Sequence, residues 1–423
     1  MVAAFVRFRL MFIAVIAGLV FALHLVFGAA PVAAQARVDG EIDALNILSW
    51  DGGGGDPGLT GLGRGRLDLR SERDRNIQAR LTIDALLTEA MFADALAGGD
   101  SAGGEEDSDG EAELSGGAGA GFGGAPAAAL FSVPRASLRF RFPVTEDYTV
   151  RVTTGRDRVS WGHGVLFNAA DVIFGADGSG VADFRETGDD LRDETTWLTA
   201  LYLPLGDFAY AEPIVLPALP VFDSDPAAQT GARSIEHTRA GGRVNFEIGR
   251  FTLEPGYLYD PADDRNDFVL STQGLLGIDV YGGARLAVDA DIDRDNLDER
   301  STFSLGAYHR ESITPDLSVD ARFEALLRPG ARWEAQEDSD AEYAVSVYPE
   351  VVVSPSRTVS LIGRSIISPI DRSARISGGV NWSVFGGFDM LAIADVEIGD
   401  EHSVFSWERE GAAAFTTGVR YRF

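Results

Sequence analysis

The sequence predicts an all-β protein that folds as a closed antiparallel transmembrane β-barrel of about 18 strands in one domain. Three observations lead to this prediction. Short segments alternate apolar and polar residues, and short turns alternate with long acidic loops. Beyond the N-terminal segment, no stretch is apolar for long enough to form a membrane-spanning helix. The mean hydropathy of +0.00 also argues against a bundle of apolar helices, whereas only alternate residues of a barrel strand face lipid.

The N-terminal 36 residues are predicted to be a cleaved signal peptide. Arg7 and Arg9 supply a basic start, and residues 10–27 are almost wholly apolar. Residues 34–36, Ala-Gln-Ala, place small side chains at the two positions that a signal peptidase reads. The apolar stretch is longer than a usual signal core, so an uncleaved anchor is the alternative. The predicted domains are therefore a signal peptide over 1–36 and a barrel over 37–423.

The strands follow from alternation and spacing. In the segment 137–142, Leu138 and Phe142 share one face while Arg139 and Arg141 share the other, because side chains alternate along a strand. The predicted strands are 41–50, 61–71, 76–87, 135–143, 147–161, 195–205, 208–217, 237–248, 251–260, 266–276, 279–290, 301–312, 316–327, 342–353, 357–367, 375–385, 388–398 and 412–423. Sixteen strands is the alternative, since the first pair and 266–290 have the weakest patterns.

The loops are acidic. Residues 92–126 are rich in Gly and acidic side chains, contain no Arg and show no apolar periodicity, so they are predicted to form a flexible outer loop. The chain has no Lys and a formal charge of −29, which excludes nucleic acid as a partner because phosphate binding needs a basic surface.

The C-terminal strand carries the most specific pattern. Phe415, Val419, Tyr421 and Phe423 share one face, and the printed sequence stops at the aromatic residue. This pattern resembles the terminal-strand signal of outer-membrane proteins, with Tyr421 and Phe423 as the assembly signal. The resemblance implies a bacterial outer-membrane location, with membrane lipid and the barrel-assembly machinery as partners.

One internal segment, 155–171, resembles a motif of porin-like and alginate-export-type outer-membrane barrels. The matching residues are Gly155, Arg156, Trp161, Gly162, Gly164, Phe167, Asn168 and Asp171, while Ala169 stands where the motif often has Pro. The match is short, so the resemblance implies the class and no particular solute.

The same segment can be interpreted from its residues alone. Trp161 is expected at the lipid–water boundary, Gly162 and Gly164 allow a sharp exit from the strand, and Asn168 and Asp171 suit turns. A strand-to-loop corner and a pore constriction remain equal alternatives.

A row of arginines is predicted to line the pore. Opposite the apolar lipid face lie Arg139 and Arg141 on one strand and Arg151 on the next. A bulge at Gly155 would add Arg156 and Arg158 and would keep Val159 and Trp161 outside. If the following loop folds inward, these arginines would face its acids Asp171, Asp177, Asp183, Glu186, Asp189 and Asp190 and create a transverse field. The alternative is simple pairing with acids on neighbouring strands, and the overall acidity predicts a mild cation preference.

Enzymatic features are weak, so no enzyme activity, cofactor or metal site is predicted. The chain has no Cys and no Gly-x-Ser-x-Gly elbow. The His residues after the signal segment are scattered, and His163 is the best single candidate for a hydrolase site in an outer loop. The acids Asp289, Asp291, Asp293 and Asp295 fail as a calcium loop because Arg294 and Arg300 occupy key positions.

The predicted function is passive diffusion of small polar or charged solutes through a porin-like channel. The alternatives are a selective exporter or uptake channel for acidic sugars, a barrel hydrolase, and a structural surface protein. The sequence leaves the oligomeric state open.

The signal-peptide assignment generates the first testable prediction. Cleavage after Ala36 should leave Arg37 as the mature N-terminus, because Ala34 and Ala36 are the small residues that signal peptidase requires. Mass spectrometry of the outer-membrane fraction measures this directly, and an intact Met1 there would contradict it.

Overall fold

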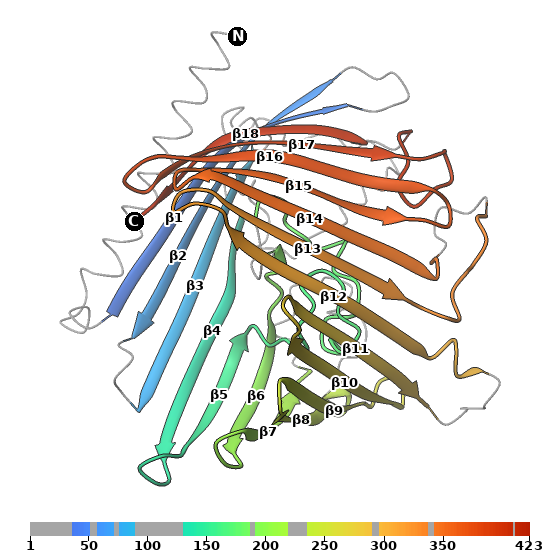
Figure 1. Ribbon diagram of the computed structural model, residues 1–423. Coiled ribbons are helices and arrows are strands. Elements are labelled where there is room, and N and C mark those ends of the chain that lie inside the picture. The colour runs from blue at the N-terminus through green and yellow to red at the C-terminus, as the bar shows by residue number, and fades with distance from the viewer. Residues whose placement is uncertain are drawn as a thin grey trace, which may run out of the picture.

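The computed structural model shows one closed barrel (Figure 1). It describes residues 36–50, 57–71, 76–88, 130–186, 191–218, 235–289, 296–336, 342–408 and 411–423. The predicted flexible loop at 92–126 and the predicted signal peptide over 1–36, apart from Ala36, lie outside the described residues. Within the described residues, no helix is long and apolar enough to cross a membrane.

Eighteen strands form a single sheet. They are β1 (Ala36–Trp50), β2 (Gly58–Ser71), β3 (Ile77–Thr88), β4 (Leu130–Pro143), β5 (Thr149–Asp157), β6 (Thr196–Pro204), β7 (Ala209–Leu216), β8 (Arg239–Ile248), β9 (Phe251–Asp260), β10 (Arg265–Leu275), β11 (Asp279–Val288), β12 (Ser301–Ser312), β13 (Ser318–Leu327), β14 (Val345–Ser356), β15 (Val359–Ser368), β16 (Ser373–Phe385), β17 (Phe388–Ile398) and β18 (Ala413–Arg422). A short 3-10 helix, η4 (Ile235–His237), precedes β8.

Each strand pairs antiparallel with the next, and β1 pairs with β18 to close the barrel. Closure satisfies the backbone groups that an open sheet edge would leave unpaired. The predicted closed all-β barrel and its eighteen strands are therefore confirmed, including the first pair and β10–β11, and the sixteen-strand alternative is wrong.

Connections differ in length between the two ends of the barrel, as the sequence predicts. One end, here called the short-turn end, carries the connections of two to five residues from β2 to β3, β4 to β5 and so on to β16 to β17. The first residue of β1 and the last residue of β18 also lie at this end. The other end, the long-loop end, carries the connections of four to 41 residues, including the one between β5 and β6.

The outer surface is apolar because of strand alternation. On β4, Leu138 and Phe142 point outward and are 43% and 52% exposed, while Arg139 and Ser137 face the lumen. Large exposed side chains recur around the barrel, for example Phe268, Leu305, Val351, Trp382, Met390 and Phe415. An exterior of this kind matches the apolar band that a membrane barrel presents to lipid.

The core lies inside the barrel, where the connection between β5 and β6 folds into the lumen (Figure 1). One buried cluster packs residues 159–173 of this connection on β6, β7, β9 and β10. A second packs residues 166–191 on β13, β14 and β15. The inner wall thus carries apolar side chains on β6, β7, β9, β10 and β13 to β15, where this connection packs against it.

The seam between β1 and β18 combines backbone, ionic and aromatic contacts. Gly40 and Phe423 exchange two backbone hydrogen bonds, of 2.9 and 3.0 Å. A Cβ on Gly40 would overlap the ring of Phe423, which stacks at 5.7 Å on Tyr421. Inside the seam, the Arg420 guanidinium donates to the Asp43 carboxylate at 2.8 Å.

This geometry generates the second prediction. Deleting Phe423 should lower the yield of heat-modifiable barrel, because the seam loses two backbone hydrogen bonds and the ring that covers Gly40. Gel shift of the outer-membrane fraction with and without heating measures the yield. Truncation of an exposed aromatic ring elsewhere, Phe208→Ala in the turn from β6 to β7, serves as the control. Equal yields of both variants would contradict the assembly role of Phe423.

Candidate functional site in the barrel lumen

The candidate site is the lumen at the level of residues 158–195, here called the constriction loop. This loop leaves β5, contacts the inner wall from β9 round to β15, and then reaches β18, β2 and β4 before it enters β6. It therefore touches the wall on all sides of the lumen.

A buried carboxylate on β13 holds the middle of the loop. Glu324 is 0% exposed, and its oxygens accept the backbone N–H groups of Val165, Leu166 and Phe167, each at 2.8 Å. The Tyr281 hydroxyl on β11 donates to the same carboxylate at 2.6 Å. These four hydrogen bonds offset the cost of burying a charge that has no ion-pair partner among the described residues.

The neighbouring strands explain why these groups can meet. Gly306 on β12 lies in register between Tyr281 and Glu324. A Cβ at Gly306 would overlap the Tyr281 ring, so this glycine leaves the space that the ring crosses to reach the carboxylate.

A second wall carboxylate holds the start of the loop. Glu254 on β9 accepts the N–H of Gly162 at 3.0 Å and a hydrogen bond from Arg243 at 3.0 Å. Further along, the Ser304 hydroxyl on β12 accepts the N–H of Ala169 at 2.9 Å. Wall side chains therefore satisfy loop backbone groups that no regular secondary structure satisfies.

The structure corrects the position expected for Trp161. Its side chain is fully buried inside the barrel rather than at the lipid–water boundary, and Val159 lies in the same cluster. The ring packs beside Gly256, where a Cβ would come within 3.2 Å of it. The expectation was wrong because β5 ends at Asp157, so the strand alternation no longer applies to these residues.

The rest of the motif forms turns inside the lumen. The Asn168 amide donates to the Trp161 carbonyl at 2.7 Å, and Asp171 accepts the N–H groups of Ile173 and Phe174, both at 3.2 Å. Burial raises the pKa of Asp171 to about 6, against the effect of Arg192 at 3.5 Å.

The glycines of the motif fit these turns. Gly162 has a φ of +82°, which favours glycine. A Cβ on Gly164 would overlap the backbone of Phe167, whose side chain is 1% exposed. The motif residues from Trp161 to Asp171 therefore lie inside the barrel, in turns that pack against its inner wall.

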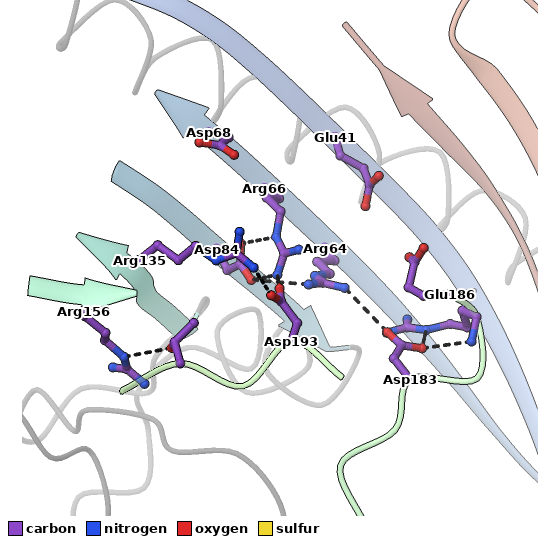
Figure 2. A network of polar contacts seen from close by, with 12 residues as sticks. Glu41, Arg64, Arg66, Asp68, Asp84, Arg135, Arg156, Asp183, Glu186 and Asp193 are labelled. Carbon is purple, nitrogen blue, oxygen red and sulfur yellow. Dashed lines mark hydrogen bonds and ion pairs between the residues drawn. The ribbon is translucent and has the colours of Figure 1, made fainter. Parts of the chain in front are cut away.

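Ion pairs hold the last part of the loop against the wall (Figure 2). Asp193 pairs with Arg135 on β4 and with Arg66 on β2, the latter at 3.0 Å. Glu186 pairs with Arg420 on β18 at 2.6 Å. Asp183 pairs with Arg185 at 2.6 Å and with Arg64 at 3.8 Å.

These pairs correct the expected transverse field. The loop does fold inward, but its acids bind arginines on β2, β4 and β18, whereas the five predicted pore arginines have other contacts. Asp171 pairs with Arg192 within the loop, and Asp177 pairs with Arg328 beyond β13. Asp189 and Asp190 lie outside the described residues.

The five predicted pore arginines occupy different environments. Arg139 lines the lumen and donates to the Thr153 hydroxyl at 3.3 Å. Arg151 stacks on Tyr202 at 3.8 Å, and Arg141 lies directly opposite it in the strand pair. Arg158 lines the lumen just beyond the end of β5.

Arg156 is placed differently, because the bulge expected at Gly155 is absent. β5 keeps its register with both β4 and β6 through Gly155, so Arg156 lies on the outward face of the strand, as Val152 does, and the expectation that it points into the pore was wrong. Its guanidinium donates to the Thr195 hydroxyl at 3.1 Å (Figure 2). Gly155 instead has a φ of +117°, and a Cβ there would overlap the Ala136 carbonyl.

The constriction loop separates two lumenal cavities. The larger, about 1130 Å³, lies toward the short-turn end between the wall of β2 to β4 and the wall of β10 to β13. The smaller, about 510 Å³, lies toward the long-loop end beside Arg285 and Arg328. Any solute that crosses the barrel has to pass the loop.

His163 does not form a catalytic group with its neighbours. Its Nε2 atom is buried without a hydrogen-bond partner among the described residues. Burial lowers its pKa, so the ring is neutral at neutral pH. Across the described ranges, no cluster of three or more His, Asp or Glu side chains is arranged to hold a metal ion.

Sequence reasoning missed the wall residues that hold the loop, chiefly Glu254, Glu324, Arg66 and Arg420. The sequence does contain a signal for the loop that these residues hold. Inward positions of β6, β7 and β15 carry apolar side chains such as Leu198, so both faces of these strands are apolar and something has to cover the inner one.

Comparisons with known proteins find similar solved structures but no matching family. No protein-family model and no curated protein matches the chain. The crystal structure of Acinetobacter baumannii OccAB4 is similar with a TM-score of 0.50 and 10% identity, over 92% of this chain and 98% of that one. Pseudomonas aeruginosa OccK11 (OpdR) has a TM-score of 0.49 and 9% identity, over 92% and 96%. A triple mutant of Rhodopseudomonas blastica porin has a TM-score of 0.39 and 12% identity, over 92% and 100%. The alginate-export-type resemblance of residues 155–171 finds no support in these similarities.

The Glu324 contacts generate the third prediction. Glu324→Gln should loosen the constriction loop, because an amide has one acceptor oxygen for the donors that two carboxylate oxygens now satisfy. Each orphaned buried N–H costs about 1–3 kcal/mol. Trypsin cleavage at Arg185 should become faster in the folded barrel, and single-channel conductance should rise.

The matched control is Glu311→Gln. This carboxylate is exposed and lies 3.4 Å from His309, so its loss should change neither cleavage nor conductance. If Glu324→Gln behaves like the control, Glu324 does not hold the loop.

Proposed function

We propose that the protein is a porin-like channel of the bacterial outer membrane, through which small polar or charged solutes diffuse passively. The observation that carries this proposal is the closed barrel with an apolar exterior and a constriction loop folded into a polar lumen. A closed sheet with outward apolar residues suits lipid, and the inward loop sets the size of the passage.

The two ends of the barrel support an orientation. Outer-membrane barrels keep short turns in the periplasm and long loops outside. On this basis the larger cavity opens toward the periplasm and the smaller one toward the exterior.

The alternative classes have weaker support. A barrel hydrolase would use polar groups in the outer loops, but His163 lines the larger cavity inside the lumen, and its Nε2 atom has no hydrogen-bond partner among the described residues. A purely structural surface protein has no use for a loop that buries two carboxylates to hold its own backbone in the lumen.

Reconstitution in a planar lipid bilayer tests the function and gives the fourth prediction. Purified barrel should produce discrete current steps in KCl, because the lumen is polar on both sides of the loop. A heat-unfolded sample serves as the control for leakage. Insertion of folded barrel without current steps would contradict the channel and favour the structural class.

A further inference from the structure

We propose that Arg139, Arg158 and Arg322 form a binding site in the larger lumenal cavity for a solute that carries a carboxylate or phosphate group. This inference rests on the proposed channel function and names the class of solute that the channel favours. It reverses the mild cation preference that the overall charge of −29 predicts.

The lining of the cavity has the opposite charge balance from the chain. Eight arginines and four carboxylates line it. Five of these arginines pair with carboxylates in or just behind the lining, namely Arg37, Arg70, Arg80, Arg135 and Arg192. Among the described residues, Arg139, Arg158 and Arg322 remain without a carboxylate partner. Because the cavity is enclosed by protein walls, these lining charges are screened less than charges on the outer loops. A solute inside the cavity therefore meets a positive lining although the protein as a whole is acidic.

Most of the lining carboxylates are already bound by protein donors. Asp171 and Glu194 both pair with Arg192, at 3.5 and 2.6 Å. Asp157 accepts the Ser137 hydroxyl at 2.8 Å and the backbone N–H of Arg158 at 2.9 Å. These acids do not neutralise the arginines on the far walls of the cavity.

Arg139 carries its charge without a carboxylate neighbour. Its partners in register are Gln78 on β3 and Thr153 on β5, both uncharged. Among the described residues, its guanidinium donates a hydrogen bond to the Thr153 hydroxyl at 3.3 Å, and no acid lies within ion-pair distance.

Arg322 approaches the cavity from β13, on the opposite wall. Its partner in register is Glu350, but that carboxylate accepts the Tyr348 hydroxyl at 2.8 Å and lies 3.5 Å from Arg364. The Nε and one Nη atom of Arg322 are buried and have no hydrogen-bond partner in the described part of the chain. Buried donors of this kind are costly unless a ligand or water accepts from them.

Arg158 adds a third charge from the start of the constriction loop. Its backbone is fixed by the Asp157 carboxylate, while its guanidinium lines the cavity with no acid in ion-pair range among the described residues. The three arginines come from β4, β13 and the loop, so an anion between the walls can meet donors from more than one side.

The chemistry of these groups selects an oxyanion. A guanidinium presents paired N–H donors that match the two oxygens of a carboxylate or the oxygens of a phosphate. A cavity of about 1130 Å³ admits a small organic anion with its remaining hydration. Tyr308, over whose ring Arg322 lies at 5.3 Å, offers an aromatic surface beside the charge.

Reversal potentials in a KCl gradient test the charge preference. Wild-type channels should be anion-selective. Arg139→Gln and Arg322→Gln should each lower the chloride-to-potassium permeability ratio by about twofold, because one unit charge acting across a water-filled cavity changes ion occupancy by about that factor. Arg357→Gln is the control, since this arginine is 77% exposed in a turn and pairs with Asp316.

Inorganic phosphate and succinate are the probes for binding. Either anion, added on the short-turn side, should reduce the chloride current of the wild type and of the Arg357→Gln variant. The reduction should be weaker in the Arg139→Gln and Arg322→Gln variants. Equal reduction of the chloride current by phosphate and succinate would show that the site recognises the oxyanion chemistry that the two share. Reduction by one anion alone would show whether the site prefers a phosphate or a carboxylate group.

The outcomes separate this inference from the proposed function. Absence of any current would contradict the channel itself. A cation-selective current would support the channel but contradict the arginine site. The same conclusion would follow if the anion preference and the block by phosphate or succinate were the same in all three variants. Equal gel shifts on heating for the wild type and the three variants establish that each comparison is made on folded barrel.

Discussion

A strand that crosses lipid can place its charged side chains only on the inner face, and this constraint decides how the lumen is built. Charged side chains of β1, β2, β3 and β18 point inward, where Arg420 on β18 pairs with Asp43 on β1 and Arg66 on β2 pairs with Asp84 on β3. Charges crowded into an enclosed space have to find partners, because an unpaired buried charge costs several kcal/mol. The charges that remain without a protein partner are therefore informative about what passes through.

The constriction loop solves a second problem of the same lumen. A barrel of eighteen strands is too wide for its own wall side chains to fill. Apolar residues between Val159 and Phe184, together with Leu191, supply the missing core, and apolar side chains on β6, β7, β9, β10 and β13 to β15 pack against them. Glu324 and Glu254 then accept the backbone N–H groups that packing alone would leave unpaired. The loop is thus both the core of the protein and the limit on its passage.

The alternation of apolar and polar residues and the spacing of turns were sufficient to predict the fold. They predicted eighteen strands, the short and long connections and the inward direction of Arg139, because each of these depends on local periodicity. The site was predicted less well. Trp161 was expected outside because its strand was extended past Asp157, and no local pattern reveals that a loop turns inward. The partners of Asp183 and Asp193 lie on β2 and β4, and pairings between segments so far apart follow from the closed barrel rather than from neighbours in sequence.

The seam between β1 and β18 has a kinetic consequence. Asp43 and Arg420, which meet inside it, are 377 residues apart in the chain. Loops of that length close slowly, because the entropy of the whole intervening chain is lost before the contact forms. Until then, β1 and β18 each present an unpaired edge that can join another chain. Closure of the seam is therefore expected to come late in folding, and shielding of the two edges before that point should protect the chain from aggregation.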